Sequence, residues 1–242
     1  MSISEKLTAV AENTTRLYNA GKDAEWNAFW DRFQDYGNRR SYNFAFINGG
    51  NNWDITNFKP KYDIIMEGNA SNAFYVWQTL STTVDIGAIL KAQGVTIDTS
   101  KATNAQNLFA YGTRIVGSLP TIDLSSAGGN TGGIFNSVKV TTIDKLIVTE
   151  ATTYGNMFRD CTNLVNIIFE GTIAQSGLDL SACKSLSGAS LESVVRSLST
   201  TTSGLTVTFP NTADATFSEY LEQDTAWVDL IAQRSNWDIK YA

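Results

Sequence analysis

The stretch NMFRDCTNLVNIIFEGTI, residues 156–173, decides the fold, because a weakened copy of it stands on either side. The upstream copy is GIFNSVKVTTIDKLIVTEAT (133–152), and the downstream copy is LSACKSLSGASL (180–191). NMFRDCTNL superposes on DLSACKSL with Cys161 on Cys183 and Leu164 on Leu186. A repeat in the low twenties that carries a short strand predicts a solenoid, whose stacked coils turn equivalent residues into internal columns.

Short β-type runs recur from residue 62 to the end of the chain, separated by turns rich in Asn, Gly, Ser and Thr. These runs cover residues 62–68, 95–100, 121–125, 145–150, 166–173, 177–182, 205–210 and 237–242. The turn regions each carry one phenylalanine that is expected to be buried: Phe74, Phe109, Phe135 and Phe158. The sequence therefore predicts an α/β repeat solenoid with one short parallel strand per coil.

The two cysteines of the chain take equivalent places on successive coils. Cys161 and Cys183 should then lie about one strand spacing, roughly 4.8 Å, apart. Cysteine is small and readily buried, which favours an internal ladder. The separation also permits a disulfide, although synthesis in a cytoplasm favours free thiols.

The N-terminal residues 2–20 have the pattern of a helix that begins with a capping box, Ser2-x-x-Glu5. An apolar stripe of coiled-coil spacing follows, interrupted by the polar Thr14: Ile3, Leu7, Val10 and Leu17. The stripe spans barely two heptads, so it is not stable alone. It predicts either a helix packed on its own domain or self-association into an oligomer.

Four segments are predicted along the chain. Residues 1–35 form a helical attachment or oligomerisation segment, and residues 36–61 form an aromatic-rich N-terminal cap. Residues 62–210 form the repeat solenoid, and residues 211–242 form a C-terminal cap of helix and strand. Apolar residues at helical spacing predict helices at 189–198 and around Trp227 to Ile231.

Composition excludes several classes of function. The chain of 242 residues has no histidine, two cysteines and a net charge of −6. A Ser-His-Asp or Cys-His catalytic set and a cysteine–histidine zinc site are therefore excluded within the chain, and no metal or cofactor is expected. Scattered basic residues argue against nucleic acid and anionic membranes. No apolar run approaches the roughly 20 residues that span a bilayer, and no secretion signal begins the sequence.

Two patterns carry candidate chemistry. Asp98, Asp123 and Asp179 each follow Ile or Leu in a strand-like run. Stacked on one another they would form a carboxylate column for Ca²⁺ or a glycan, whereas the simpler interpretation is that each bonds local N–H groups in a turn. The aromatic residues within 42–58 either stack on sugar rings or pack as a cap, and packing is favoured.

The unit MFRDCTNLVNIIF (157–169) resembles the BspA-like class of leucine-rich repeats, whose recurring text is MF-x-x-C-x-x-L-x-x-I-x-[FI]. IFNSVKVTTIDKLIV (134–148) and CKSLSGASL (183–191) match it more loosely. SEKLTAVAENTTRLYNAG (4–21), FWDRFQDYGNRRSYNFAF (29–46) and NWDIKYA (236–242) are similar to proteins of tailed phages and prophages of gut Firmicutes. The resemblance implies a virion-associated, tail-proximal protein.

Three functions follow as hypotheses. The first is a non-enzymatic structural or receptor-binding module of a phage tail, whose partners are other virion proteins and a host-surface protein or glycan. It would reach the virion after cytoplasmic assembly and form a homo-oligomer through its N-terminal helix. The second is a bacterial BspA-like surface adhesin, which should carry a secretion signal and a wall anchor. The third is a glycan-acting enzyme on a β-solenoid, which requires paired acids in a groove.

Overall fold

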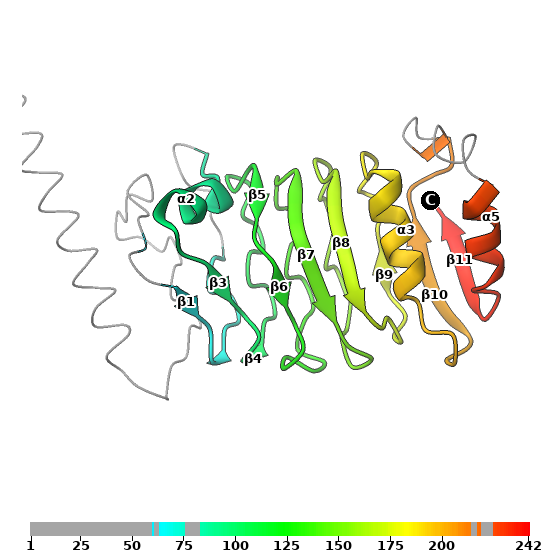
Figure 1. Ribbon diagram of the computed structural model, residues 1–242, viewed down its shortest axis with the longest axis horizontal. Coiled ribbons are helices and arrows are strands. Elements are labelled where there is room, and N and C mark those ends of the chain that lie inside the picture. The colour runs from blue at the N-terminus through cyan, green and yellow to red at the C-terminus, as the bar shows by residue number, and fades with distance from the viewer. Residues whose placement is uncertain (1–59, 61–62, 76–82, 214–216, 219–224) are drawn as a thin grey trace, which may run out of the picture.

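The fold is an elongated row of short parallel strands with helices among them, as Figure 1 shows. This computed structural model describes residues 60, 63–75, 83–213, 217–218 and 225–242. In these ranges the order is β1(Ile64–Ile65), β2(Gly68–Asn69), α2(Ile86–Gln93), β3(Ile97–Asp98), β4(Ala102–Asn104), β5(Ser118–Leu119), β6(Ile122–Asp123), β7(Thr142–Val148), β8(Asn166–Gly171), β9(Leu178–Asp179), α3(Gly188–Ser197), β10(Leu205–Phe209), α5(Thr225–Ala232) and β11(Trp237–Tyr241). It is an α/β fold with short strands in several sheets.

Every strand pair in these ranges is parallel. Ser118 pairs with Thr142, and Thr142 pairs in turn with Asn166, so the chain returns to the same row after 24 residues at each step. All eight predicted β-type runs contain a strand at the expected place. The prediction of short parallel strands at this spacing is confirmed.

On one side of β7 the neighbouring strand is interrupted and forms two pieces, β5 and β6. The prediction of one strand per coil did not include this interruption. Both β5 and β6 pair with the same side of β7 in one continuous register. Pro120 lies between them, and proline has no N–H to donate to a ladder. On its other side, β7 bulges against β8, because the register shifts between Ile143 and Leu146.

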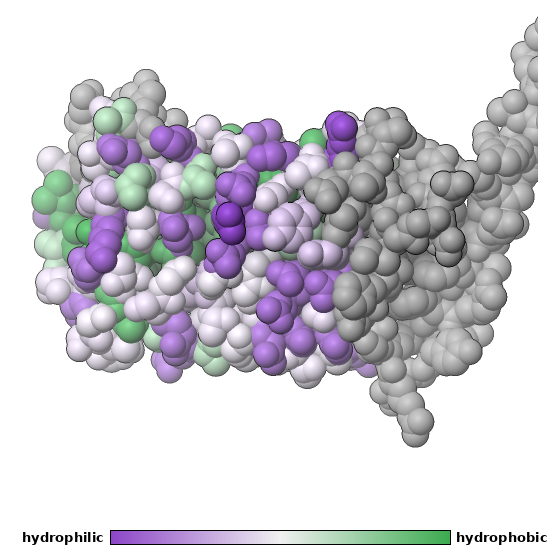
Figure 2. Space-filling view, turned by 180° about the vertical axis from the view of Figure 1, so that it is seen from behind, coloured by the Kyte–Doolittle hydropathy of each residue, from purple (hydrophilic) through white to green (hydrophobic). Residues whose placement is uncertain are grey.

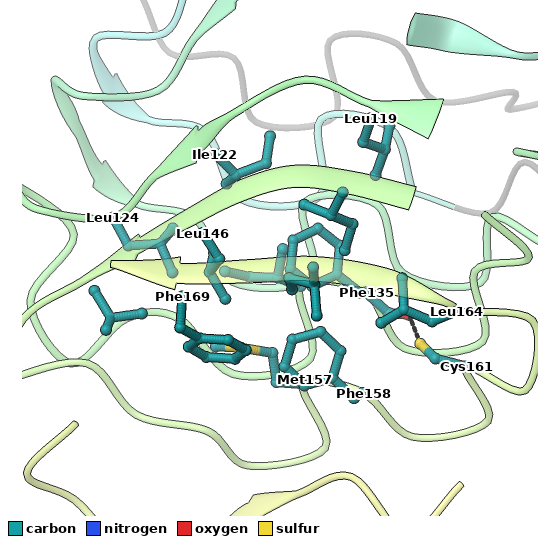
Figure 3. Packing of buried hydrophobic residues seen from close by; sticks show 14 of the residues in the cluster. Leu119, Ile122, Leu124, Phe135, Leu146, Met157, Phe158, Cys161, Leu164 and Phe169 are labelled. Atoms are coloured by element: carbon teal, nitrogen blue, oxygen red, sulfur yellow. Dashed lines mark hydrogen bonds between the residues drawn. The ribbon is translucent and has the colours of Figure 1, made fainter. Parts of the chain in front are cut away.

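A column of phenylalanine rings fills the interior. The rings of Phe74, Phe109, Phe135 and Phe158 stack in sequence at centroid distances of 5.0, 6.1 and 5.4 Å. All four side chains are at most 1% exposed. Figure 3 shows the rings of Phe135 and Phe158 beside the apolar side chains of β7 and β8. The predicted column is confirmed, and offset ring pairs add about 0.5–1.5 kcal/mol each beyond their buried area.

Helix α3 occupies the position beside β8 that a further strand would take. The hydroxyl of Ser190 accepts a hydrogen bond from Ile167 N at 2.9 Å, and that of Ser193 accepts from Phe169 N at 3.1 Å. Ser187 begins the helix and accepts from Ser190 N through its side chain. Serine hydroxyls thus replace backbone carbonyls along an edge that would otherwise be open to further pairing. The predicted helix at 189–198 is confirmed.

Beyond α3 a three-stranded sheet closes the C-terminal end. Its order is β11-β10-β9, with Val207 paired to Leu178 on one side and to Ile239 on the other. Helix α5 contributes Trp227, whose ring meets Phe209 and Phe217 edge to face. The helix and strand expected here are confirmed. The boundaries proposed for the four segments remain predictions, and residues 1–59 lie outside the described ranges.

Candidate functional site

The three candidate aspartates do not form one column. Asp98 in β3 and Asp123 in β6 belong to two different sheets that meet through the Thr99 hydroxyl, and Asp179 lies in β9 of a third sheet. Each carboxylate accepts a hydrogen bond from the backbone N–H two residues later, at 2.9, 2.8 and 2.9 Å respectively. The simpler interpretation, a local turn, is confirmed for all three. Within the described ranges no cluster of three or more acidic, cysteine or histidine side chains is placed to hold a metal ion.

The cysteines occupy equivalent internal places, as predicted. The Cys161 thiol donates to the carbonyl of Phe135 at 2.8 Å, and the Cys183 thiol lies 4.0 Å from the carbonyl of Phe158. Both thiols are free and buried. Burial raises the pKa of Cys161 to about 12 and that of Cys183 well above its ordinary value. They are structural side chains, because a protonated buried thiol is inert.

The proposed oligomerisation residues Ile3, Leu7, Val10 and Leu17 lie outside the described residues. The aromatic block 42–58 lies outside them as well. Neither prediction is tested by the structure.

A repeated hydrogen-bond pattern joins the segments that carry the phenylalanine column. In segment 105–111, Asn107 N donates to Gly132 O at 3.0 Å and Phe109 N to Ile134 O at 2.9 Å. Segment 131–138 makes the same two bonds to segment 155–161: Gly133 N donates to Gly155 O, and Phe135 N donates to Met157 O. Alternate N–H groups of each segment therefore bind the next segment, and those between them close turns.

Segment 155–161 has the same backbone shape as these neighbours. Its residues Asn156 and Asp160 have left-handed φ values of 54° and 58°, as Asn107 and Tyr111 do with 55° and 57°. Its turn bonds are also made, for example Arg159 N to Asn156 O at 3.3 Å. The N–H groups of Asn156, Phe158 and Asp160 should therefore bind the next segment. Among the described residues none of these three has an acceptor.

A hollow of about 560 Å³ opens at this place. Its first wall is formed by segment 155–161, and its second wall by residues 177–182 with two threonines of β10. The acceptors in segment 155–161 are the carbonyls of Gly155, Met157 and Arg159. When Cys161 is superposed on Cys183, these become the carbonyls of Gly177, Asp179 and Ser181. All three of these residues line the hollow. We call this space the 156–182 groove. One of its walls presents free donors, and the other presents the acceptors they would have met.

The 156–182 groove opens between segment 155–161 and residues 177–182, although the second wall bonds onward to β10 as the repeated pattern predicts. Gly177 N donates to Thr206 O at 3.4 Å, and Leu180 N donates to Thr208 O at 2.8 Å, which ties the second wall to β10. The walls still approach each other near the interior, where the thiol of Cys183 lies 4.0 Å from Phe158 O. The side chain of Cys183 therefore bridges the two walls at the interior end of the 156–182 groove.

Polar side chains surround the 156–182 groove and apolar ones form its floor. The floor contains the buried Phe158 and Leu178. The lining residues with polar side chains are Asn156, Arg159, Asp160, Asp179, Ser181, Thr206 and Thr208. Figure 2, the view from behind, shows a mostly hydrophilic face with hydrophobic residues recessed between polar ones toward the C-terminal end. This arrangement suits noncovalent binding of a polar molecule.

Sequence reasoning missed the groove. The match of Cys-x-x-Leu in 161–164 and 183–186 predicts segments in contact, and the interior side chains do follow that register. Nothing in the local sequence shows that the backbone of 177–182 stands apart from segment 155–161. Gly177, with a φ of +95°, is the one local sign that the chain turns away there.

Comparison with protein-family models, with curated proteins and with solved structures finds no match to this chain. In the described parts of the chain, no helix has both the length and the apolar character needed to cross a membrane.

Proposed function

We propose that the chain is a non-enzymatic binding module built as a solenoid of BspA-type leucine-rich repeats. The 24-residue parallel register of β5, β7 and β8 and the phenylalanine column support the repeat architecture. The Cys161 and Cys183 contacts support the equivalence of successive units. The residues that carry the family resemblance, 157–169, form one such unit.

The observation that carries a binding function is the 156–182 groove. Segment 155–161 repeats the backbone of its neighbours, yet three of its donors have no protein acceptor in the described chain and line a hollow with a polar border. Unpaired backbone groups at a partly enclosed surface cost free energy unless water or a ligand binds them. A rigid scaffold that holds such groups in place is suited to recognition.

The module is proposed to belong to a phage tail, where it binds other virion proteins and a protein or glycan of the host surface. Support for this setting comes from the resemblance of residues 4–21, 29–46 and 236–242 to proteins of tailed phages and prophages. The N-terminal stripe of Ile3, Leu7, Val10 and Leu17 is proposed to join copies of the chain.

Two measurements test the proposal. Purified tail particles should contain this chain, and fluorescently labelled protein should bind intact host cells and not unrelated cells. If the chain instead fractionates with the bacterial cell surface, it is an adhesin and the virion proposal is wrong. For the oligomer, light scattering should give a multiple of 26.4 kDa, and replacement of Leu7 and Val10 by Asp should reduce it to one chain.

A further inference from the structure

The backbone groups and charges that line the 156–182 groove indicate which kind of molecule it binds. We infer that it binds a neutral carbohydrate segment, whose hydroxyl groups bridge the free N–H groups of Asn156, Phe158 and Asp160 to the carbonyls of the opposite wall. The inference rests on the proposed binding function and names the ligand class for that site.

The side-chain contact across the 156–182 groove argues against an added peptide strand. A strand placed between two others needs about 4.8 Å on each side, or roughly 9.6 Å in total. The thiol–carbonyl distance across the groove is 4.0 Å at Cys183, against 2.8 Å for the equivalent contact of Cys161. An added strand would have to displace this side-chain contact, whereas single hydroxyl groups can bridge the walls without doing so.

A hydroxyl group fits this gap because it accepts one hydrogen bond and donates another. It can accept from a free N–H of segment 155–161 and donate to a carbonyl near Asp179 or Ser181. Water meets the same need, so a ligand gains affinity when it presents several hydroxyls at once and releases the water that it replaces. The three donors recur at every second residue, so one rigid ligand with several hydroxyls can satisfy more than one of them.

The charges of the lining select a neutral ligand. Asp160 and Asp179 bring two carboxylates to the groove, against the one guanidinium of Arg159. Arg159 Nε already lies 3.7 Å from Asp160 Oδ2. Carboxylates accept strong hydrogen bonds from hydroxyls and repel anions, so acidic sugars, phosphates and acidic peptides are disfavoured. The volume of about 560 Å³ is of the size that small-molecule sites have.

The test uses an array that carries neutral hexose and N-acetylhexosamine oligosaccharides, sialylated and sulfated oligosaccharides, and short peptides. The full chain should bind a subset of the neutral oligosaccharides, and calorimetry with the strongest of them gives the dissociation constant. Ala182→Trp fills the groove and should abolish binding. Asp160→Asn keeps a residue that tolerates the left-handed φ of 58°, and should weaken binding about tenfold.

Matched controls lie elsewhere on the surface. Ala151→Trp places the same large side chain on an exposed residue outside the groove, and Asp144→Asn removes one exposed charge from β7. Both should bind as the wild-type chain does. Circular dichroism should show that all four variants remain folded, and Asp160→Asn decides the matter if Ala182→Trp does not fold.

The inference is overturned if no neutral oligosaccharide binds, if only acidic sugars or peptides bind, or if Asp160→Asn binds as tightly as Asp144→Asn. Suppose that one of these overturning results is obtained but the labelled chain still binds host cells. The binding function then stands, and only the ligand class is wrong. If neither cells nor array bind the chain, the proposed function fails as well.

Discussion

Replacement of Ser190 by alanine tests whether α3 closes the edge of β8 through its serine hydroxyls. Ser190 is fully buried, and its hydroxyl accepts from Ile167 N at 2.9 Å and lies 3.3 Å from Val165 O. Alanine leaves the Ile167 N–H buried without an acceptor, which costs about 1–3 kcal/mol. We expect the free energy of unfolding to fall by about 2 kcal/mol, and the midpoint of thermal unfolding to fall by about 4–8 °C for a chain of this size.

The assay is urea unfolding, combined with amide hydrogen exchange at Ile167. Exchange at this amide should accelerate in Ser190→Ala, because its hydrogen bond is lost while the strand remains. Ser193→Ala should cost less, since Ser193 is only partly buried and Phe169 N lies 3.1 Å from its hydroxyl. Ser185→Ala, on an exposed turn, is the control.

The reasoning is refuted if Ser190→Ala and Ser185→Ala agree within about 0.5 kcal/mol, the scatter expected of surface substitutions. It is also refuted if exchange at Ile167 is unchanged, because the hydroxyl would then not be the acceptor that protects this amide.

Three further predictions concern stability. Gly171→Ala should destabilise the fold by about 3 kcal/mol or more, because its φ is +102° and a Cβ would stand 2.0 Å from Val148 O; Gly155→Ala, which has open space around it, should cost far less in the same urea titration. Phe135→Ala should cost about 3–5 kcal/mol, since it removes the ring between two stacked neighbours, and a calorimetric loss below 1 kcal/mol would contradict the column. Stability should fall as pH rises from 9 toward 12, because burial raises the pKa of the Cys161 thiol from 9.0 to about 12 and the contribution of its protonated form is complete only below pH 9. The Cys161→Ala variant should show a shallower alkaline decline, and an unchanged decline would show that this thiol does not contribute to it.

Much of the architecture could be predicted from the sequence pattern, because stacked repeat units have similar local sequences. The strand-like runs, the phenylalanine positions and the Cys161–Cys183 equivalence all depend on residues that meet copies of themselves one unit later. Helix α2 was not predicted, although its signals are short-range: Asp85 caps its first turn and Gly94 ends it with a φ of 67°. It escaped prediction because only eight residues separate these signals, and their apolar content also suits a strand.

The 156–182 groove is not predictable in the same way, because it depends on where the C-terminal sheet holds residues 177–182. Residues 177–182 have a sequence that suits contact with segment 155–161, and their interior side chains take that register. Their backbone pairs onward with β10, about thirty residues later, yet receives no hydrogen bond from the N–H groups of Asn156, Phe158 and Asp160. The position of 177–182 is set by the C-terminal sheet to which it belongs, and no local pattern records that position.

The direction of the hydrogen bonds in the row has a mechanical consequence. Interstrand bonds run across the strands, so in this molecule they point along the long axis from β1 toward β11 (Figure 1). Tension along that axis acts on all the interfaces of the row in series, so the weakest strand pair would separate first. Tension across the row would shear all the bonds of a pair at once. The molecule should therefore resist a lateral pull far better than an axial one.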